Sequence, residues 1–261
     1  MTAGERVATA SPAASFGRQT LAQLGFELRL TARRGENVLA TLVIPVALLV
    51  FFTAYPIGLP LGSRPVDVVV PAIIAVAIIS AGLVNLGIAT AYERSYGVLK
   101  RLGATPLPRS ALVVAKIGSV VVLEVVQLAV IVAVAVGLLG WRAPSLDIAL
   151  LAAGLVLGTA AFAGLGLLLA GTLRAEATLA IANGLFLAFV LVGGVIVPPA
   201  QLPDALAAIV RALPAAALAN FLRAAFGGTA DPGLSAGAAL VVLAVWAIAT
   251  VVIAARSFRW E

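Results

Sequence analysis

Six long apolar runs, separated by short polar segments, occupy most of this chain of 261 residues. A run of about 20 apolar residues is long enough to cross the hydrocarbon core of a bilayer as a helix. Within lipid every backbone polar group has to be paired inside the protein, so such runs form helices. We therefore predict an all-α polytopic membrane protein with six transmembrane helices within a domain at 37–255. The predicted helices cover residues 37–55, 67–90, 110–140, 147–171, 177–197 and 234–255.

The composition supports this class and excludes several functions. Hydrophobic residues make up 62% of the chain and charged residues 11%, whereas a soluble domain has about 45–50% and about 25%. Because cysteine and histidine are absent, there is no disulfide, and the commonest metal ligand and general base is missing. No G-x-x-x-x-G-K-[ST] loop is present to cradle a nucleotide. We expect no catalytic residue, no metal and no cofactor bound by this chain.

The basic residues are unevenly distributed among the polar segments. Cytoplasmic loops of membrane proteins carry an excess of Lys and Arg. With the tails at 1–36 and 256–261 inside, only four of the 17 basic residues lie outside: Arg64, Arg142, Arg211 and Arg223. We therefore expect both termini in the cytoplasm. The same bias accounts for the net charge of +6 without a nucleic-acid partner, and the richness in Arg, Ala and Val indicates the cytoplasmic membrane of a bacterium.

A charged segment at 92–109 interrupts the apolar runs on the cytoplasmic side. Residues 91–102, AYERSYGVLKRL, have the pattern of a short amphipathic helix. Tyr92, Tyr96 and Leu99 fall on one face of this predicted helix. The opposite face holds Glu93, Arg94, Lys100 and Arg101, and the prolines Pro106 and Pro108 stop the helix.

Two interpretations of this segment are open. It can lie on anionic lipid as an interfacial helix, or it can dock a cytoplasmic protein. The following run at 110–140 favours docking, because about 30 helical residues extend roughly 45 Å and exceed a hydrocarbon core of about 30 Å. Its first turns would lift the segment clear of the lipid.

The segment at 198–228 is too polar and too often interrupted by proline to be an ordinary span. We predict a short interfacial or re-entrant helix pair on the outer side of the membrane. The prolines and glycines that shape this region are Gly193, Gly194, Pro198, Pro203 and Pro214.

Two stretches of the sequence resemble the permease subunits of type-2 ABC transporters, with the daunorubicin and antibiotic-resistance exporters as the most similar subgroup. The first stretch matches at Glu93, Arg94, Gly97, Leu99, Lys100, Arg101, Leu102, Ala104, Thr105, Pro106, Leu107, Pro108 and Arg109. The second matches at Gly193, Gly194, Pro198, Leu202, Pro203 and Pro214. The span count and order also agree, so the resemblance covers nearly the whole chain.

This resemblance implies an assembly. Two ATPase subunits, which bind ATP and Mg²⁺, would associate with this chain and with a second copy of it or a similar permease. The coupling helix that sits in an ATPase cleft would lie within Glu93–Arg109, with Tyr96 on the face that the helical pattern defines. A connecting helix would lie along the membrane surface before the first span, where Arg29 and Arg33 suit contact with lipid headgroups.

Polar residues form a stripe along the predicted helix at 110–140. Lys116, Ser119, Glu124 and Gln127 share one face. A carboxyl at the depth of Glu124 costs about 2.5–3.5 kcal/mol on insertion scales, so this side chain should face the bundle or a partner subunit. Two roles are open: a cargo-facing or gating residue, or a hydrogen bond between helices with Asn85 or Asn183.

Glycines recur in the run at 147–171, beginning with the pair Gly154 and Gly158. Small residues let membrane helices approach closely. We interpret this pair as a packing contact within the chain in preference to a contact between two copies.

The sequence therefore indicates the permease of an ATP-driven exporter that moves an amphipathic drug, antibiotic or lipid-like cargo. The alternative is an ATPase-independent secondary transporter or a lipid-binding scaffold. A secondary transporter should show charged pairs near the midplane and broken helices at matched positions of its two halves, and only Glu124 points that way. A membrane enzyme has the least support, because the sequence shows no set of a nucleophile and a base.

Overall fold

The computed structural model describes residues 14–33, 35–55 and 64–257, and this part of the chain is helical with no strand. The all-α prediction is confirmed for it. The elements are α1 (Phe16–Arg33), α2 (Gly35–Ala54), α3 (Pro65–Ile79), the π-helix η1 (Ser80–Leu86), α4 (Gly87–Ser95), α5 (Val98–Gly103), α6 (Arg109–Gly137), α7 (Ile148–Thr172), α8 (Ala175–Leu191), the 3₁₀ turn η2 (Pro199–Gln201), α9 (Asp204–Arg211), α10 (Pro214–Ala225) and α11 (Ala236–Ser257).

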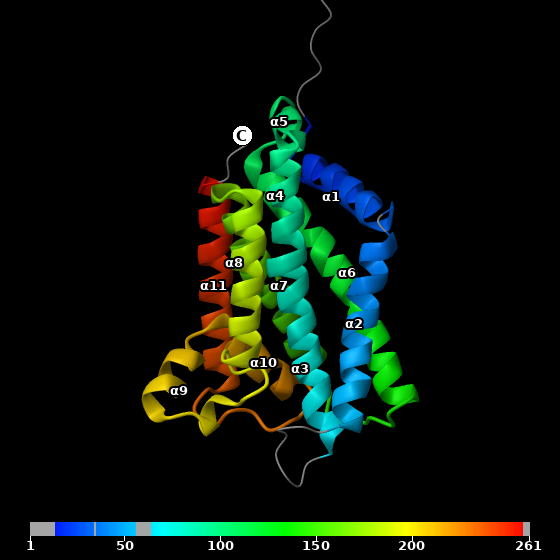
Figure 1. The fold of residues 1–261 in the computed structure, drawn as a ribbon, viewed down its shortest axis with the longest axis vertical. Coiled ribbons are helices and arrows are strands. Elements are labelled where there is room, and N and C mark those ends of the chain that lie inside the picture. The colour runs from blue at the N-terminus through cyan, green and yellow to red at the C-terminus, as the bar shows by residue number, and fades with distance from the viewer. Residues whose placement is uncertain (1–13, 34, 56–63, 258–261) are drawn as a thin grey trace, which may run out of the picture.

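Four helical stretches of the described residues are long and apolar enough to cross a membrane. They are Pro65–Ser95, in which α3, η1 and α4 form one continuous helix, and the helices α6, α7 and α11. Helices α2 and α8 run beside them (Figure 1), but their apolar stretches, Thr41–Ala54 and Ala175–Leu191, are shorter. Four of the six predicted spans therefore correspond to helices of sufficient length. The count of six stays a prediction.

The bundle has two different ends (Figure 1). One end, here called the α5 end, is formed by α5, which connects α4 to α6. The last turns of α11 lie nearby. Helix α1 lies obliquely against the bundle at this end. The opposite end, here called the α10 end, carries α9 and α10, which the chain inserts between α8 and α11.

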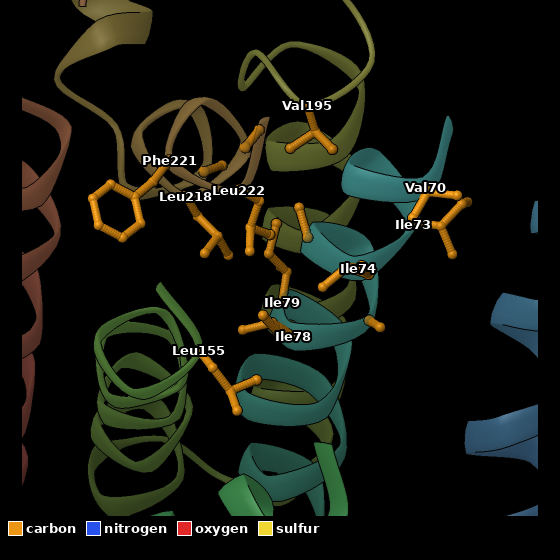
Figure 2. Close-up of a cluster of buried hydrophobic side chains, with 14 of the residues drawn as sticks. Val70, Ile73, Ile74, Ile78, Ile79, Leu155, Val195, Leu218, Phe221 and Leu222 are labelled. Atoms are coloured by element: carbon orange, nitrogen blue, oxygen red, sulfur yellow. The ribbon is translucent and has the colours of Figure 1, made fainter. Parts of the chain in front are cut away.

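Helix α3 forms the centre of the core. In the most apolar window of Pro65–Ser95, 78% of the residues are buried, compared with 28% for α6 and for α11. A helix that is apolar on all sides belongs in the interior. Figure 2 shows Ile74 and Ile78 of α3 meeting Leu155 of α7 and Leu218 and Leu222 of α10. Helix α10 is thus packed into the end of the bundle and does not lie on its surface.

Glycines let α7 pack closely against η1 and α4. A Cβ atom added at Gly166 would lie 2.6 Å from the carbonyl oxygen of Gly82, and one added at Gly87 would lie 3.0 Å from the Cα of Gly166. The predicted pair Gly154 and Gly158 faces α10, as added Cβ atoms would touch the side chains of Phe221 and Leu218. This pair packs within the chain, as predicted.

The α7–η1 contact can be tested with one methyl group. We expect Gly166→Ala to destabilise the protein by about 1–3 kcal/mol, because overpacking of a close contact forces the backbones apart. Gly184→Ala is the matched control: Gly184 has no atom within 4 Å of an added Cβ, so this change should be neutral or stabilising by up to about 1 kcal/mol. Thermal unfolding of the detergent-purified protein measures both. Equal stabilities of the two variants would contradict the close contact.

Candidate functional site

The charged segment at the α5 end is two helices and not one. Helix α4 ends at Ser95, and α5 begins at Val98. Between them Gly97 adopts a left-handed conformation with φ 71°, which glycine enters without the steric penalty that a Cβ atom brings. The prediction of one amphipathic helix over 91–102 is therefore wrong, because glycine turns the chain at its centre.

The turn at Gly97 also separates residues that the helical pattern placed on one face. Leu99 is fully buried and packs in a cluster with Leu112 and Val113 of α6, whereas 74% of the Tyr96 surface is exposed. Leu99 thus anchors α5 to α6, and Tyr96 points away from this cluster. The surface of the segment is formed by exposed residues, namely Lys100, Arg101, Thr105, Pro106, Pro108 and Arg109.

Arg94 joins the end of α4 to the neighbouring helices. Its Nη2 donates a hydrogen bond to the carbonyl oxygen of Leu173, directly after α7. The carbonyl groups in the last turn of a helix have no partner within that helix, so the guanidinium satisfies one of them. Arg94 therefore fixes α4 in place and does not point outward from the bundle.

Lys116 lies at the centre of a buried ion-pair cluster. Its side chain is 2% exposed, and its Nζ lies 2.7 Å from Glu93 Oε2 and 3.1 Å from Glu27 Oε1. Glu27 also accepts a hydrogen bond of 2.8 Å from Gln23 Nε2, one turn earlier in α1. We call Glu27, Glu93 and Lys116 the charge cluster. It joins α1, α4 and α6, three elements that the chain otherwise connects only through turns and further helices.

The charge cluster corrects the sequence analysis in two respects. Glu93 was expected on the docking surface, but it turns inward to Lys116. Glu27 was not recognised at all, although a buried ammonium requires a compensating carboxylate and Glu27 is an acid near the α5 end. The buried face of α1 carries Gln23 and Glu27, while Leu21 and Phe26 are exposed.

Removal of the ammonium should destabilise the protein. Lys116→Met leaves two carboxylates close together without their partner, and we expect a loss of about 3 kcal/mol, measured by thermal unfolding in detergent. A triple variant that adds Glu27→Gln and Glu93→Gln should recover much of this loss, because no buried charge is then left uncompensated. A Lys116→Met variant as stable as the wild type would show that the cluster contributes nothing.

A groove with a polar floor extends from the charge cluster toward the middle of the bundle. A small pocket of about 120 Å³ beside the cluster is continuous in its lining with a pocket of about 340 Å³ between α2, α3 and α8, because Thr41 and Asn85 line both. Asn85 belongs to η1 and is exposed, although most of its helix is buried. Gln127 donates to the carbonyl oxygen of Thr41 across the second pocket, at 2.6 Å.

Glu124, three residues before Gln127 on the same face of α6, is buried against α7. Its partner is the Thr159 hydroxyl, which also donates to the Leu155 carbonyl oxygen at 2.6 Å. A hydroxyl has one proton to donate. If that proton goes to Leu155, the bond to Glu124 requires a protonated, neutral carboxyl group that donates to Thr159. A neutral acid also avoids the cost of a charge within a span.

The structure thus gives Glu124 a partner that was not expected. Among the described residues, neither of the predicted partners Asn85 and Asn183 forms a hydrogen bond with Glu124, and Asn183 instead donates to the Leu179 carbonyl oxygen within α8. Thr159 had no charge or motif to reveal it in the sequence. Of the two open roles, the geometry supplies the hydrogen bond between helices.

At the α10 end, prolines and glycines shape the predicted helix pair. Pro203 precedes α9, and Pro214 is the first residue of α10, where its missing N–H has no cost. The two helices meet at a bend of 81°. Pro198 precedes η2, and Gly193 and Gly194 lie in the turn that ends α8 before the predicted end of its run at Val197.

Arg223 fastens this turn to α10. Its Nη2 donates to the carbonyl oxygens of Gly194 and Val195, at 3.3 and 2.8 Å. Gly194 has φ 84°, and an added Cβ would lie 2.9 Å from the side chain of Ala216. The positive φ and the close contact with Ala216 therefore both require glycine at position 194.

A second ion pair closes the segment after α10. Asp231 accepts hydrogen bonds from Arg211 Nε and Nη2, at 2.9 and 3.1 Å. Its backbone N–H donates to the side chain of Asn220. The Arg211 guanidinium holds the pKa of Asp231 below its ordinary value. Arg211 and Asp231 thus tie α9 to the loop that leads into α11.

This ion pair predicts an acid sensitivity. A carboxyl with a lowered folded-state pKa stabilises the protein above its unfolded pKa of about 3.9, and this contribution is lost as the pH falls through the folded-state value. We expect Asp231→Asn to lower the thermal stability at pH 7 and to reduce the further loss on acidification to pH 3. An unchanged acid response in Asp231→Asn would contradict the assignment.

The comparisons agree with this geometry. A model of the ABC-2 type transporter family matches residues 18–226, which include the charge cluster, α5, the groove and α10. The chain belongs to the ABC-2 type transporter family. It is therefore a multi-pass membrane protein and a permease component of an ABC-type transporter, not the ATPase. A search among curated proteins gives no match. Within the described residues, no three His, Cys, Asp or Glu side chains gather as a metal site.

Proposed function

We propose that this permease belongs to an exporter in which two separate ATPase subunits dock at the α5 end. The observation that carries this proposal is an exposed basic surface, formed by Lys100 and Arg101 of α5 and by Arg109 at the start of α6. Leu99 anchors α5 to α6. A docked partner can push on such a helix without unfolding it. ATP and Mg²⁺ would be bound by the ATPase subunits.

The distribution of charge supports a cytoplasmic position for the α5 end. Of the described Lys and Arg residues, ten belong to elements at this end, and only Arg64, Arg142, Arg211 and Arg223 lie toward the α10 end (Figure 1). The positive-inside rule then places the α5 end in the cytoplasm. With α2 and α8 as further spans, the chain would cross a bacterial cytoplasmic membrane six times and keep both termini inside. Helices α9 and α10 would form the outer re-entrant segment.

The charge cluster suggests how movement would pass from the ATPase to the spans. Helix α5 follows α4 through the turn at Gly97, and Glu93 of α4 binds Lys116 of α6. Lys116 in turn binds Glu27 of α1, which would lie along the membrane surface. A displacement of α5 would therefore move α4, α6 and α1 together.

The groove suggests the class of cargo. Its lining combines the polar residues Thr41, Asn85 and Gln127, of which Asn85 is exposed, with the apolar side chains of Leu48 and Phe186. We infer an amphipathic drug, antibiotic or lipid-like molecule, whose polar part follows the floor. A second permease copy would complete the path, since α2 leaves an apolar surface with Val43 and Phe51 exposed.

Docking at α5 can be tested by reversing one exposed charge. We expect Arg101→Glu to reduce the ATPase that co-purifies with the tagged protein from its native cells by at least about tenfold, because like charges across an interface cost several kcal/mol. Arg142→Glu, the same change at an exposed residue of the α10 end, should leave recovery unchanged. Both variants should unfold at the wild-type temperature, because neither side chain is buried.

Two outcomes would contradict the proposal. Normal ATPase recovery with Arg101→Glu would place the docking surface elsewhere. Recovery of the wild-type chain alone, under conditions that keep other complexes intact, would favour the secondary-transporter alternative, in which Glu124 is the titratable group within the spans.

A further inference from the structure

A second cavity lies at the α10 end, away from the groove. Its volume is about 630 Å³, and its lining comes from the start of α3, the segment before α7, the turn at η2, and α10 with the loop that follows it. Four charged residues line it: Arg64, Asp67, Arg223 and Asp231. Pro144, Pro198 and Pro232 contribute apolar walls. The proposed transport function makes no use of this cavity.

Arg223 brings a buried positive charge to the cavity, and Asp231, the acid that acts on it, is hydrogen-bonded to Arg211. Only 7% of the Arg223 surface is exposed, and its Nη2 is bound to the carbonyl oxygens of Gly194 and Val195. Its Nε and Nη1 have no protein acceptor among the described residues. Asp231, the acid that shares the cavity on this side, has committed both oxygens to Arg211 and one also to the Gly233 N–H.

Asp67 brings an unsatisfied acceptor to the same cavity. Its Oδ1 is buried and has no hydrogen-bond partner. Within the described chain no ion pair forms between Asp67 and Arg223, so the two opposite charges line one space without meeting. A buried polar group without a partner costs about 1–3 kcal/mol. A ligand that carries both charges would compensate the Arg223 guanidinium and the Asp67 carboxylate together.

The level of the cavity limits what that ligand can be. Its lining includes Asp67 at the start of α3 and Pro144 shortly before α7. Because both helices are apolar, we infer that the cavity lies at the depth at which hydrocarbon gives way to lipid headgroups. A volume of about 630 Å³ also exceeds the needs of a single small ion. Guanidinium groups favour phosphate through paired hydrogen bonds, and a carboxylate favours an ammonium group.

We propose that this cavity binds the zwitterionic phosphoethanolamine headgroup of a phospholipid. The phosphate accepts hydrogen bonds from Arg223, and the ammonium group binds Asp67. Arg64, whose Nη2 donates to the Gly140 carbonyl oxygen, is a second cation in the lining. Arg223 would bind free phosphate in the same way as the phosphate of a headgroup, so this residue does not distinguish the two ligands. Asp67 distinguishes the lipid headgroup, because it repels an anion and attracts the ammonium group.

The test measures lipid binding to the full-length, detergent-purified protein by native mass spectrometry. Equimolar phosphatidylethanolamine and phosphatidylglycerol are added, and the ratio of their adducts is recorded. We expect the wild type to favour phosphatidylethanolamine by about tenfold, the value of one charge-assisted contact. Asp67→Asn, which preserves the side-chain shape, should bring the ratio close to one. Arg223→Gln should weaken both lipids, and Arg142→Gln at the same end should change neither.

The outcomes separate the possible ligands. Equal adducts of the two lipids in the wild type, or a preference that survives Asp67→Asn, would overturn the proposal. Displacement of phosphatidylethanolamine by an equal concentration of inorganic phosphate would show a simple phosphate site and would also overturn it. Because Arg223 fastens the turn after α8, Arg223→Gln can fail to fold, and Asp67→Asn then decides alone. Neither result bears on ATPase docking at α5.

Discussion

A buried ammonium group determines the arrangement of the α5 end. Lys116 sits on α6 with almost no exposed surface, and a charge in that position is tolerated only with partners that satisfy it. Glu93 and Glu27 supply these partners from α4 and α1. This requirement helps to position α1 across the bundle, together with the part-buried Leu24, which lies against Gly118 of α6. One cation thus fixes three elements.

The rest of the bundle is held together by close packing between helices. Between lipid-exposed helices there is little hydrophobic driving force, so close packing of small residues takes its place. Gly82, Gly87 and Gly166 bring α7 against η1 and α4, and the Thr250 hydroxyl of α11 donates to the Ala161 carbonyl oxygen of α7. These contacts make α4 part of a rigid unit. Under the proposed docking, a push on α5 would reach a packed body at α4, which the charge cluster extends to α1.

Much of this could be read from the sequence, because apolar length and proline position act locally. The all-α class, the long helices and the bent pair at α9 and α10 follow from such local rules. The errors arose where tertiary contacts decide. Tyr96 and Leu99 share a face only if the helix continues through Gly97, and the glycine turn separates them. The pairing of Glu27 with Lys116 spans 89 positions, and Thr159 has no sequence pattern that points to Glu124.

The acids and bases of α6 show how one helix can meet two environments. Lys116 keeps its charge because two carboxylates reach it at the α5 end, whereas Glu124, about 12 Å further along the helix, has only a hydroxyl beside it. The first site is an ion pair and the second is a hydrogen bond. Beyond them, the α10 end is charged again, with Arg211 bound to Asp231 and Arg223 facing its cavity. Ion pairs toward both ends of the bundle, with only a hydrogen bond at Glu124 between them, are what the proposed membrane position leads us to expect, because a charge is most costly within the hydrocarbon.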